Sequence, residues 1–142
     1  MSAPVQVDLE LATPSCEKGI GKLIVSPDSK DLIAGVRAQT LAIWPDDRGY
    51  FLEVLRMGQG LAKDFPKEST QVSAALSYPG TIKAFHFHRR QTDCWVPVGG
   101  MLQVALVDLR KAISDLRRAQ HFVLGRAAAL AVAGCSRRRA QL

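Results

Sequence analysis

Residues Gly80–Arg110 read GTIKAFHFHRRQTDCWVPVGGMLQVALVDLR, and they place two histidines, one residue apart, in a strand-like run. Alternate side chains of a strand point to opposite faces of the sheet. Ile82, Ala84, His86 and His88 would therefore share one face, while Lys83, Phe85 and Phe87 would share the other. Because two imidazoles then point the same way, we expect the chemistry of this protein on this segment.

Short strand-like runs separated by turn residues recur along the chain. We predict strands over residues 36–43, 50–57, 71–77, 81–88, 94–98 and 101–109. A turn at 45–47, a loop over 58–67 and a hairpin turn at Gly99-Gly100 would connect them. A meander of short strands suits a jelly roll or a barrel. After Arg110 the pattern changes, because residues 111–119 and 125–134 are rich in Ala, Leu and Arg, which favours helix.

The spacing of Gly80, His86, His88, Asp93 and Gly100 resembles the signature of cupins, which are small antiparallel barrels. Asp93 stands where that signature usually carries Glu. In a metal-binding cupin, the two histidines and the aspartate would supply two nitrogens and one oxygen to Fe(II), Mn(II) or Ni(II). A fourth histidine ligand is not expected, because His121 falls in the helix-prone tail.

Three blocks of sequence carry a longer resemblance, from about Ile33 to Arg110. They are DDRGYFLE at 46–53, QVSAALSYPGTIKAFHF at 71–87 and VALVDLR at 104–110. In order and spacing they resemble the dTDP-4-dehydrorhamnose 3,5-epimerase family, which has a cupin-like jelly roll. The resemblance implies an all-β fold, a cupin-like jelly roll that is here an incomplete barrel, and the composition adds a helix-prone C-terminal tail.

We expect three parts: an epimerase-related β domain at 33–110, which the resemblance covers, and, from composition, an N-terminal arm at 1–32 and the tail at 111–142. The family continues with further strands that contain its general-acid tyrosine, so the resemblance implies truncation after Arg110. Two interpretations of the tail stay open. It is a native, divergent helical end, or it is read out of frame, since a one-base shift within 125–142 yields a string resembling the family's next block.

The resemblance also implies an activity: proton abstraction next to the ketone of a nucleotide-linked 4-keto-6-deoxy sugar, in rhamnose-type deoxysugar biosynthesis. His86 falls at the position of the family's base, and an imidazole suits this role near neutral pH. No cofactor is implied. Substrate-binding roles are implied for Arg48, Phe51, Glu53, Gln71, Ser73 and Lys83. A non-catalytic protein that still binds a sugar nucleotide is a third interpretation.

Several positions depart from the family. Ser73 replaces Asn, and Lys83 replaces an Arg, so it cannot form a bidentate fork with phosphate. Asp93 falls where the family has a phosphate-binding Lys, and a carboxylate there would repel a diphosphate. His88 stands where the family commonly has Gln, which favours a hydrogen-bonding role. Lys83 and His86 would lie on opposite faces of an ideal strand, so one shared site requires a bulge.

Structural roles compete with some of these assignments. Arg48 and Glu53 would then simply pair across neighbouring strands. Trp44 and Trp95 are expected in the core or at its rim, because large amphipathic rings tend to be mostly buried.

Composition limits the classes of function. The 142 residues are 47% apolar and suit one globular domain. No transmembrane run or signal peptide is recognised, so we expect a cytoplasmic protein without a membrane partner. Three scattered cysteines predict reduced thiols. The net charge of +6 is concentrated partly at 117–118 and 137–139, without aromatic neighbours, so no nucleic-acid partner is expected. A homodimer is the expected assembly.

Overall fold

The computed structural model describes residues 20–88, 90–110, 119–125 and 128–133, the last of these as backbone. Strands dominate the described residues, and one 3-10 turn, η1 (Gly60–Ala62), is their helical element. None of these residues belongs to a helix that is long and apolar enough to cross a membrane. The strands are β1 (Lys22–Leu23), β2 (Val36–Thr40), β3 (Ile43–Asp46), β4 (Gly49–Leu52), β5 (Thr92–Trp95), β6 (Leu102–Val107), β7 (Ala119–Leu124) and β8 (Ala128–Ala133).

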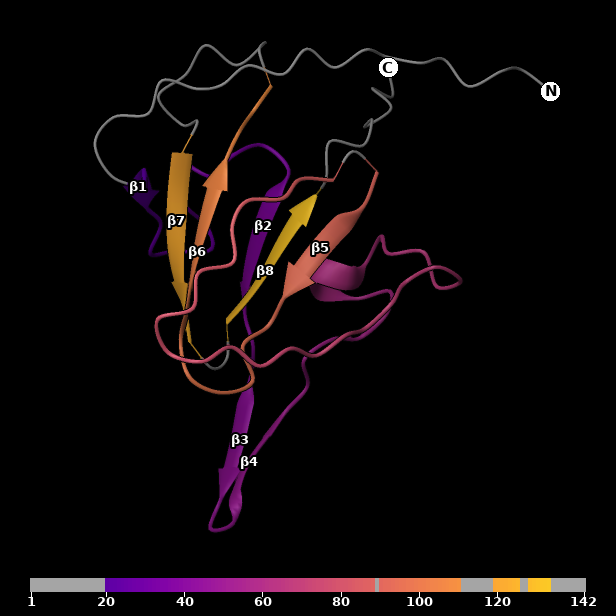
Figure 1. Ribbon diagram of the computed structural model, residues 1–142. Helices are drawn as coiled ribbons and strands as arrows, with labels where there is room; N and C mark the ends of the chain where they lie inside the picture. Colours follow the sequence, from indigo (N-terminus) through magenta and orange to yellow (C-terminus); the bar gives the residue numbers. More distant parts are fainter. Residues whose placement is uncertain (1–19, 89, 111–118, 126–127, 134–142) are drawn as a thin grey trace, which may run out of the picture.

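Two three-stranded sheets, in the orders β1-β7-β6 and β2-β8-β5, form the body of the molecule (Figure 1). Strand β1 runs parallel to β7, and the other pairs are antiparallel. The chain changes sheet between β5 and β6 and again between β7 and β8. The β3-β4 hairpin projects from this body. These open sheets are consistent with an incomplete cupin-like jelly roll, so the predicted all-β class is confirmed.

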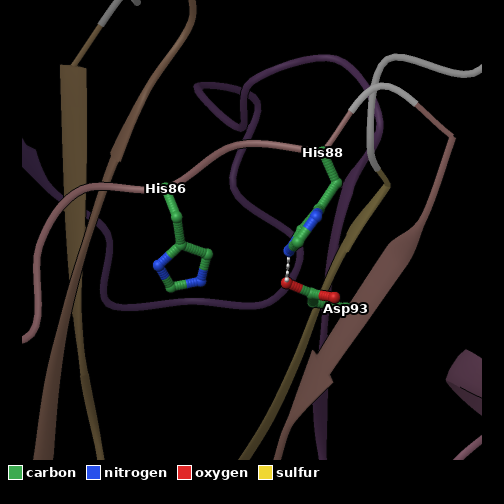
Figure 2. A group of neighbouring side chains, drawn as sticks. All are labelled: His86, His88 and Asp93. Atoms are coloured by element: carbon green, nitrogen blue, oxygen red, sulfur yellow. Dashed lines mark ion pairs between the residues drawn. The ribbon is translucent and has the colours of Figure 1, made fainter.

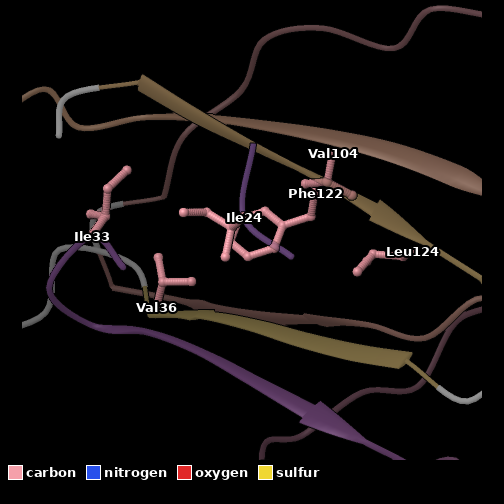
Figure 3. Packing of buried hydrophobic residues seen from close by; sticks show 6 residues of the cluster. All are labelled: Ile24, Ile33, Val36, Val104, Phe122 and Leu124. Atoms are coloured by element: carbon pink, nitrogen blue, oxygen red, sulfur yellow. The ribbon is translucent and has the colours of Figure 1, made fainter. Parts of the chain in front are cut away.

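The hydrophobic core lies between the two sheets (Figure 3). Strand β7 shows how the sequence builds it, because its residues alternate between buried and more exposed positions. Phe122 is 3% exposed, while the next residue, Val123, is 51% exposed. Trp95 packs against the edge of the core, as predicted, whereas Trp44 on the hairpin is 54% exposed. The buried residues of this core are Ile24, Ile33, Val36, Val104, Phe122 and Leu124.

The tail was predicted to be helical, and this is wrong for the part that the structure describes, which forms β7 and β8. Residues 111–118, 126–127 and 134–142 of the predicted helical tail lie outside the described residues. Helix propensity differs by at most about 0.7 kcal/mol among ordinary residues, and tertiary pairing overrides it here. Strand β8 lies between β2 and β5, and β7 lies between β1 and β6, so each has a partner strand on both sides.

His121 consequently lies in β7 and not in a helix. Its Nδ1 is 3.1 Å from the carbonyl oxygen of Gly21, and its own carbonyl accepts a 2.9 Å hydrogen bond from the backbone N–H of Ile24. Gly21 has a φ of +83°, and a Cβ there would lie 2.2 Å from the carbonyl carbon of Ala119. Glycine is therefore required where β1 meets β7.

Two further strand predictions, over 71–77 and 81–88, are wrong, because these residues form no strand pairing with the other described residues. Their apolar side chains remain outside the core, and Ile82 is 87% exposed. Alternation alone does not form a strand when no neighbouring edge supplies hydrogen bonds.

The connections were predicted with mixed success. Gly99-Gly100 does not close a hairpin, since the flanking strands β5 and β6 belong to different sheets. The predicted strand at 36–43 ends at Thr40, and the one at 50–57 ends at Leu52. The turn near 45–47 is confirmed as the β3-β4 turn, which lies at 47–48, and the loop at 58–67 is confirmed with η1 inside it.

Candidate functional site

Three side chains converge beside the second sheet, and they are His86, His88 and Asp93 (Figure 2). One potential ligand atom from each lies within 4.8 Å of the others. The imidazole rings of His86 and His88 meet edge to face, with 5.6 Å between their centroids and 64° between their planes. His88 Nε2 is 3.2 Å from Asp93 Oδ2. The sequence prediction that both imidazoles point the same way agrees with this close approach.

The three residues are held differently. Asp93 belongs to β5, in register with Val132 of β8, and its side chain is 17% exposed. Its other oxygen, Oδ1, accepts a 2.7 Å hydrogen bond from Nε2 of Gln91. His86 and His88 come from the unpaired segment 81–88. The carboxylate is therefore anchored by the sheet, while the imidazoles approach it from the segment outside the sheet.

His86 is the chemically open member of this group. Its ring contacts His88, and it makes no hydrogen bond or ion pair within the described part of the chain. A neutral imidazole nitrogen without a partner can accept a proton from a ligand or coordinate a metal ion. His88, paired with Asp93, is oriented by the carboxylate, which agrees with the prediction of a hydrogen-bonding role.

Lys83 lies on the same unpaired segment and is exposed. No hydrogen bond or ion pair connects it to His86 among the residues that the structure describes. A bulge was expected to bring Lys83 and His86 to the same face of a strand. Because residues 81–88 do not form a strand, this expectation does not apply. Gln71 and Ser73 are also exposed, and Gln71 Nε2 donates a 2.9 Å hydrogen bond to Ser73 Oγ.

Arg48 and Phe51 lie on the β3-β4 hairpin, where they border one shallow surface hollow. The Arg48 guanidinium forms a 2.7 Å ion pair with Asp46, and its backbone N–H donates to the same carboxylate. The side-chain hydrogen bond from Arg48 holds the pKa of Asp46 below its usual value. Phe51 packs on Trp44, with ring centroids 5.7 Å apart.

Glu53 pairs with Arg56, three residues further along the chain, and not with Arg48. The structural alternative, in which Arg48 and Glu53 pair across neighbouring strands, is therefore wrong, because each of them pairs with a residue close to it in sequence. The hydrogen bond from Arg56 lowers the pKa of Glu53. Glu53 lines a pocket of about 120 Å³ whose wall includes Leu61 and Cys94. Burial raises the pKa of the Cys94 thiol.

The predicted site residues are thus distributed over five places: the histidine cluster, the hairpin hollow, the pocket beside Glu53, the 71–73 pair and the exposed Lys83. Tyr50 was not assigned a role from the sequence, although it lies inside the first block. Its hydroxyl donates a hydrogen bond to the carbonyl of Val98, connecting the hairpin to the loop after β5. The third block ends at Asp108 and Arg110, which pair with each other, and Arg110 also donates to the Ala34 carbonyl.

The chain is similar to known proteins over the part that contains the three sequence blocks. A family model described as dTDP-4-dehydrorhamnose 3,5-epimerase matches residues 30–133, a range that continues past Arg110 through β7 and β8. The "Spore coat polysaccharide biosynthesis protein SpsL" of Bacillus subtilis (strain 168) is 44% identical over 80 residues, or 56% of this chain and 50% of that protein. The chain therefore spans about half the length of this curated relative. No solved structure matches the present chain.

Proposed function

The chain belongs to the dTDP-4-dehydrorhamnose 3,5-epimerase family, and from this premise we propose that it abstracts a proton beside the ketone of a nucleotide-linked 4-keto-6-deoxy sugar. The reaction would serve deoxysugar biosynthesis, for which the name of the Bacillus relative provides support. The observation that carries the proposal is His86, an exposed imidazole without a hydrogen-bond partner among the described residues, inside the matched range.

In the proposed step, an unprotonated ring nitrogen of His86 removes a proton from a carbon adjacent to the C4 ketone. The electron pair of the C–H bond forms the carbon–carbon double bond of an enolate, and the carbonyl electrons move to oxygen. Return of a proton to the opposite face inverts the carbon. The oxyanion needs a positive charge or hydrogen-bond donors close by, and Lys83 is the cation that we propose for it.

Substrate binding is proposed for Arg48, Phe51 and Glu53, and for the pair Gln71 and Ser73. The exposed Arg48 guanidinium suits a diphosphate, and the exposed Phe51 ring suits a base or sugar face. Because these groups border different surfaces of one chain, we propose that a second copy completes the site, as in the expected homodimer. The same proposal accounts for the solvent-exposed apolar side chains of the unpaired segment, Ile82, Phe85 and Phe87, and for Val72 and Leu76 shortly before it. A cytoplasmic location is proposed with it, since sugar nucleotides are made there.

We also propose that residues 119–133 are native and not read out of frame. Support comes from the pairing of β7 and β8 on both sides and from a family match that reaches residue 133. Sequencing the gene from the codon of Val104 past the stop tests this. An inserted or deleted base would contradict it.

Exchange of solvent deuterium into the substrate tests the proposed activity. The chain is incubated in D2O with dTDP-4-keto-6-deoxyglucose, and the sugar is followed by NMR at C3 and C5. We expect deuterium at one or both carbons above the rate in buffer. Exchange without inversion would mean that the base works and the acid on the opposite face does not. Absence of exchange at high protein concentration would contradict the proposal and favour a protein that only binds sugar nucleotides.

A further inference from the structure

We propose that His86, His88 and Asp93 form a binding site for a divalent transition-metal ion, with two imidazole nitrogens and one carboxylate oxygen as ligands. This site is independent of the proposed epimerase activity, because it depends only on how the three side chains are placed. Figure 2 shows the ring of His88 pointing at the carboxylate of Asp93 on β5, with the ring of His86, from the same unpaired segment, beside this pair.

The distances fit a shared ion. Zinc bonds to imidazole nitrogen and to carboxylate oxygen are about 2.0–2.2 Å, which places neighbouring ligand atoms of a tetrahedral site about 3.4 Å apart. The 3.2 Å separation of His88 Nε2 from Asp93 Oδ2 is already close to this value. The ligand atoms of the group all lie within 4.8 Å of one another, so His86 must move by no more than about 1.4 Å to reach that spacing.

That movement costs little. His86 is exposed and has no hydrogen bond or ion pair to break in the described part of the molecule. It belongs to a segment that has no strand partner, so a small shift of its backbone disturbs no ladder of hydrogen bonds. A rotation about its side-chain bonds is also open. The site can therefore close around an ion without disturbing the core.

The surroundings of Asp93 support a ligand role. Its Oδ1 is already occupied by the amide of Gln91, which leaves Oδ2 directed at the imidazole of His88. A hydrogen bond to the distal oxygen is the arrangement that commonly orients a carboxylate ligand of a metal ion. Because Asp93 is fixed in β5 and only 17% exposed, it provides a rigid anchor for the two more exposed histidines.

The ligand set also selects the ion. Two neutral imidazoles and one carboxylate carry a single negative charge, so a dication is bound with a net charge of +1. Imidazole suits Zn²⁺, Ni²⁺, Cu²⁺ and Fe²⁺, whereas Mg²⁺ and Ca²⁺ prefer sites made of oxygen. Three protein ligands leave at least one position for water or for an oxygen of a small molecule.

A bound ion would change what His86 can do. The lone pair that coordinates the metal cannot accept a proton, so the metal-loaded chain would not abstract a proton from a sugar. This consequence, unlike the site itself, rests on the proposed function. It predicts that divalent transition metals inhibit deuterium exchange and that a chelator restores it.

Calorimetric titration of the full chain, without a histidine tag, with Ni²⁺ tests the site directly. We expect one ion per chain, with affinity at least about tenfold lower in each of His86→Ala, His88→Ala and Asp93→Asn. His121→Ala is the matched control, because His121 lies in β7 against Gly21, and its titration should equal that of the unaltered chain. Circular dichroism of each variant verifies that it folds.

Two results would overturn the site: no stoichiometric binding, or binding that persists unchanged when His88 and Asp93 are replaced. The deuterium exchange assay, run with a chelator present, separates this inference from the proposed function. Ni²⁺ binding without exchange would leave the site established and the epimerase activity contradicted. Exchange without Ni²⁺ binding would give the reverse.

Discussion

Strand β7 and the segment 81–88 have similar alternating sequences and different fates. In β7 the alternation buries one face, and Phe122 and Leu124 are 3% and 5% exposed. In 81–88 the alternation buries nothing, and Phe85 is 74% exposed. The difference lies in the neighbours, because β7 lies between β1 and β6 while 81–88 has no strand partner among the described residues. A periodic pattern therefore specifies a strand only together with the edge that receives it.

The functional consequence follows from the same contrast. The two three-stranded sheets, called the sandwich below, supply one rigid element of the candidate site, Asp93. The unpaired segment 81–88 supplies the two imidazoles. Chemistry at His86 thus depends on a part of the chain that the sandwich does not hold in place. In our account, a second copy or a bound ligand orders that segment.

The largest expected effect is the difference in stability loss between a substitution in β7 and one in segment 81–88. Phe122→Ala should lower the free energy of unfolding by about 3–5 kcal/mol, because it leaves a cavity between the sheets. Phe85→Ala is the matched control and should change the stability of the monomer by less than about 0.5 kcal/mol, since its ring is exposed. Urea unfolding followed by circular dichroism measures both. Equal losses would mean that segment 81–88 packs in solution as well as β7 does.

A smaller effect, of opposite sign, is expected inside the sandwich. Gln120 is 1% exposed, and neither polar atom of its side chain has a hydrogen-bond partner among the described residues. Gln120→Met keeps the shape and removes the unsatisfied amide, so it should stabilise the fold by about 1–3 kcal/mol. Gln103→Met, at an exposed position of β6, controls for the side chain itself. A loss of stability in Gln120→Met would show that the buried amide has a partner.

Self-association probes the unpaired segment. If a second copy covers its apolar side chains, the double variant Ile82→Ser and Phe85→Ser should weaken the dimer at least about tenfold, which corresponds to about 1.4 kcal/mol. Sedimentation equilibrium measures the change. Val25→Ser is a control at an exposed apolar position outside the segment. A dimer of unaltered affinity in the double variant would place the interface elsewhere.

The smallest effect concerns β5, the strand of the two sheets that His88 of the unpaired segment contacts through Asp93. Burial raises the pKa of the Cys94 thiol, so at a given pH less thiolate is present than in a free cysteine. Alkylation by iodoacetamide at pH 8 should be several-fold slower in the folded chain than in urea, and the difference should narrow as the pH rises. The Cys16→Ser, Cys135→Ser background isolates Cys94. Equal rates in both states would mean that the thiol is exposed in solution.

The sequence predicted the fold class and the proximity of His86, His88 and Asp93 better than it predicted individual strands. The spacing of His86, His88 and Asp93 identified residues that do lie together, because the first two are close in the chain and the third is the second residue of β5, which follows them. The helix predicted for the tail failed because composition does not reveal which open sheet edges are available. The strands predicted at 71–77 and 81–88 failed because a strand-like pattern does not reveal that no sheet edge is available to pair with it.

The sequence also did not predict where Arg48, Glu53 and Lys83 lie relative to one another. Each of the first two pairs with a charge that is close to it in the chain, Asp46 and Arg56. Local ion pairs of this kind are equally compatible with binding and with structure, since exposed pairs contribute only about 0–1 kcal/mol. Their roles are decided by whether a second copy brings them beside His86.

Deuterium exchange into dTDP-4-keto-6-deoxyglucose, compared between His86→Asn and His121→Asn, tests the central claim most directly. Both variants remove one imidazole, the first from the unpaired segment and the second from the sandwich. If His86 is the base, His86→Asn should lower the exchange rate at least about 100-fold, while His121→Asn should keep a rate within a few-fold of the unaltered chain. Equal rates in the two variants would contradict the assignment of His86.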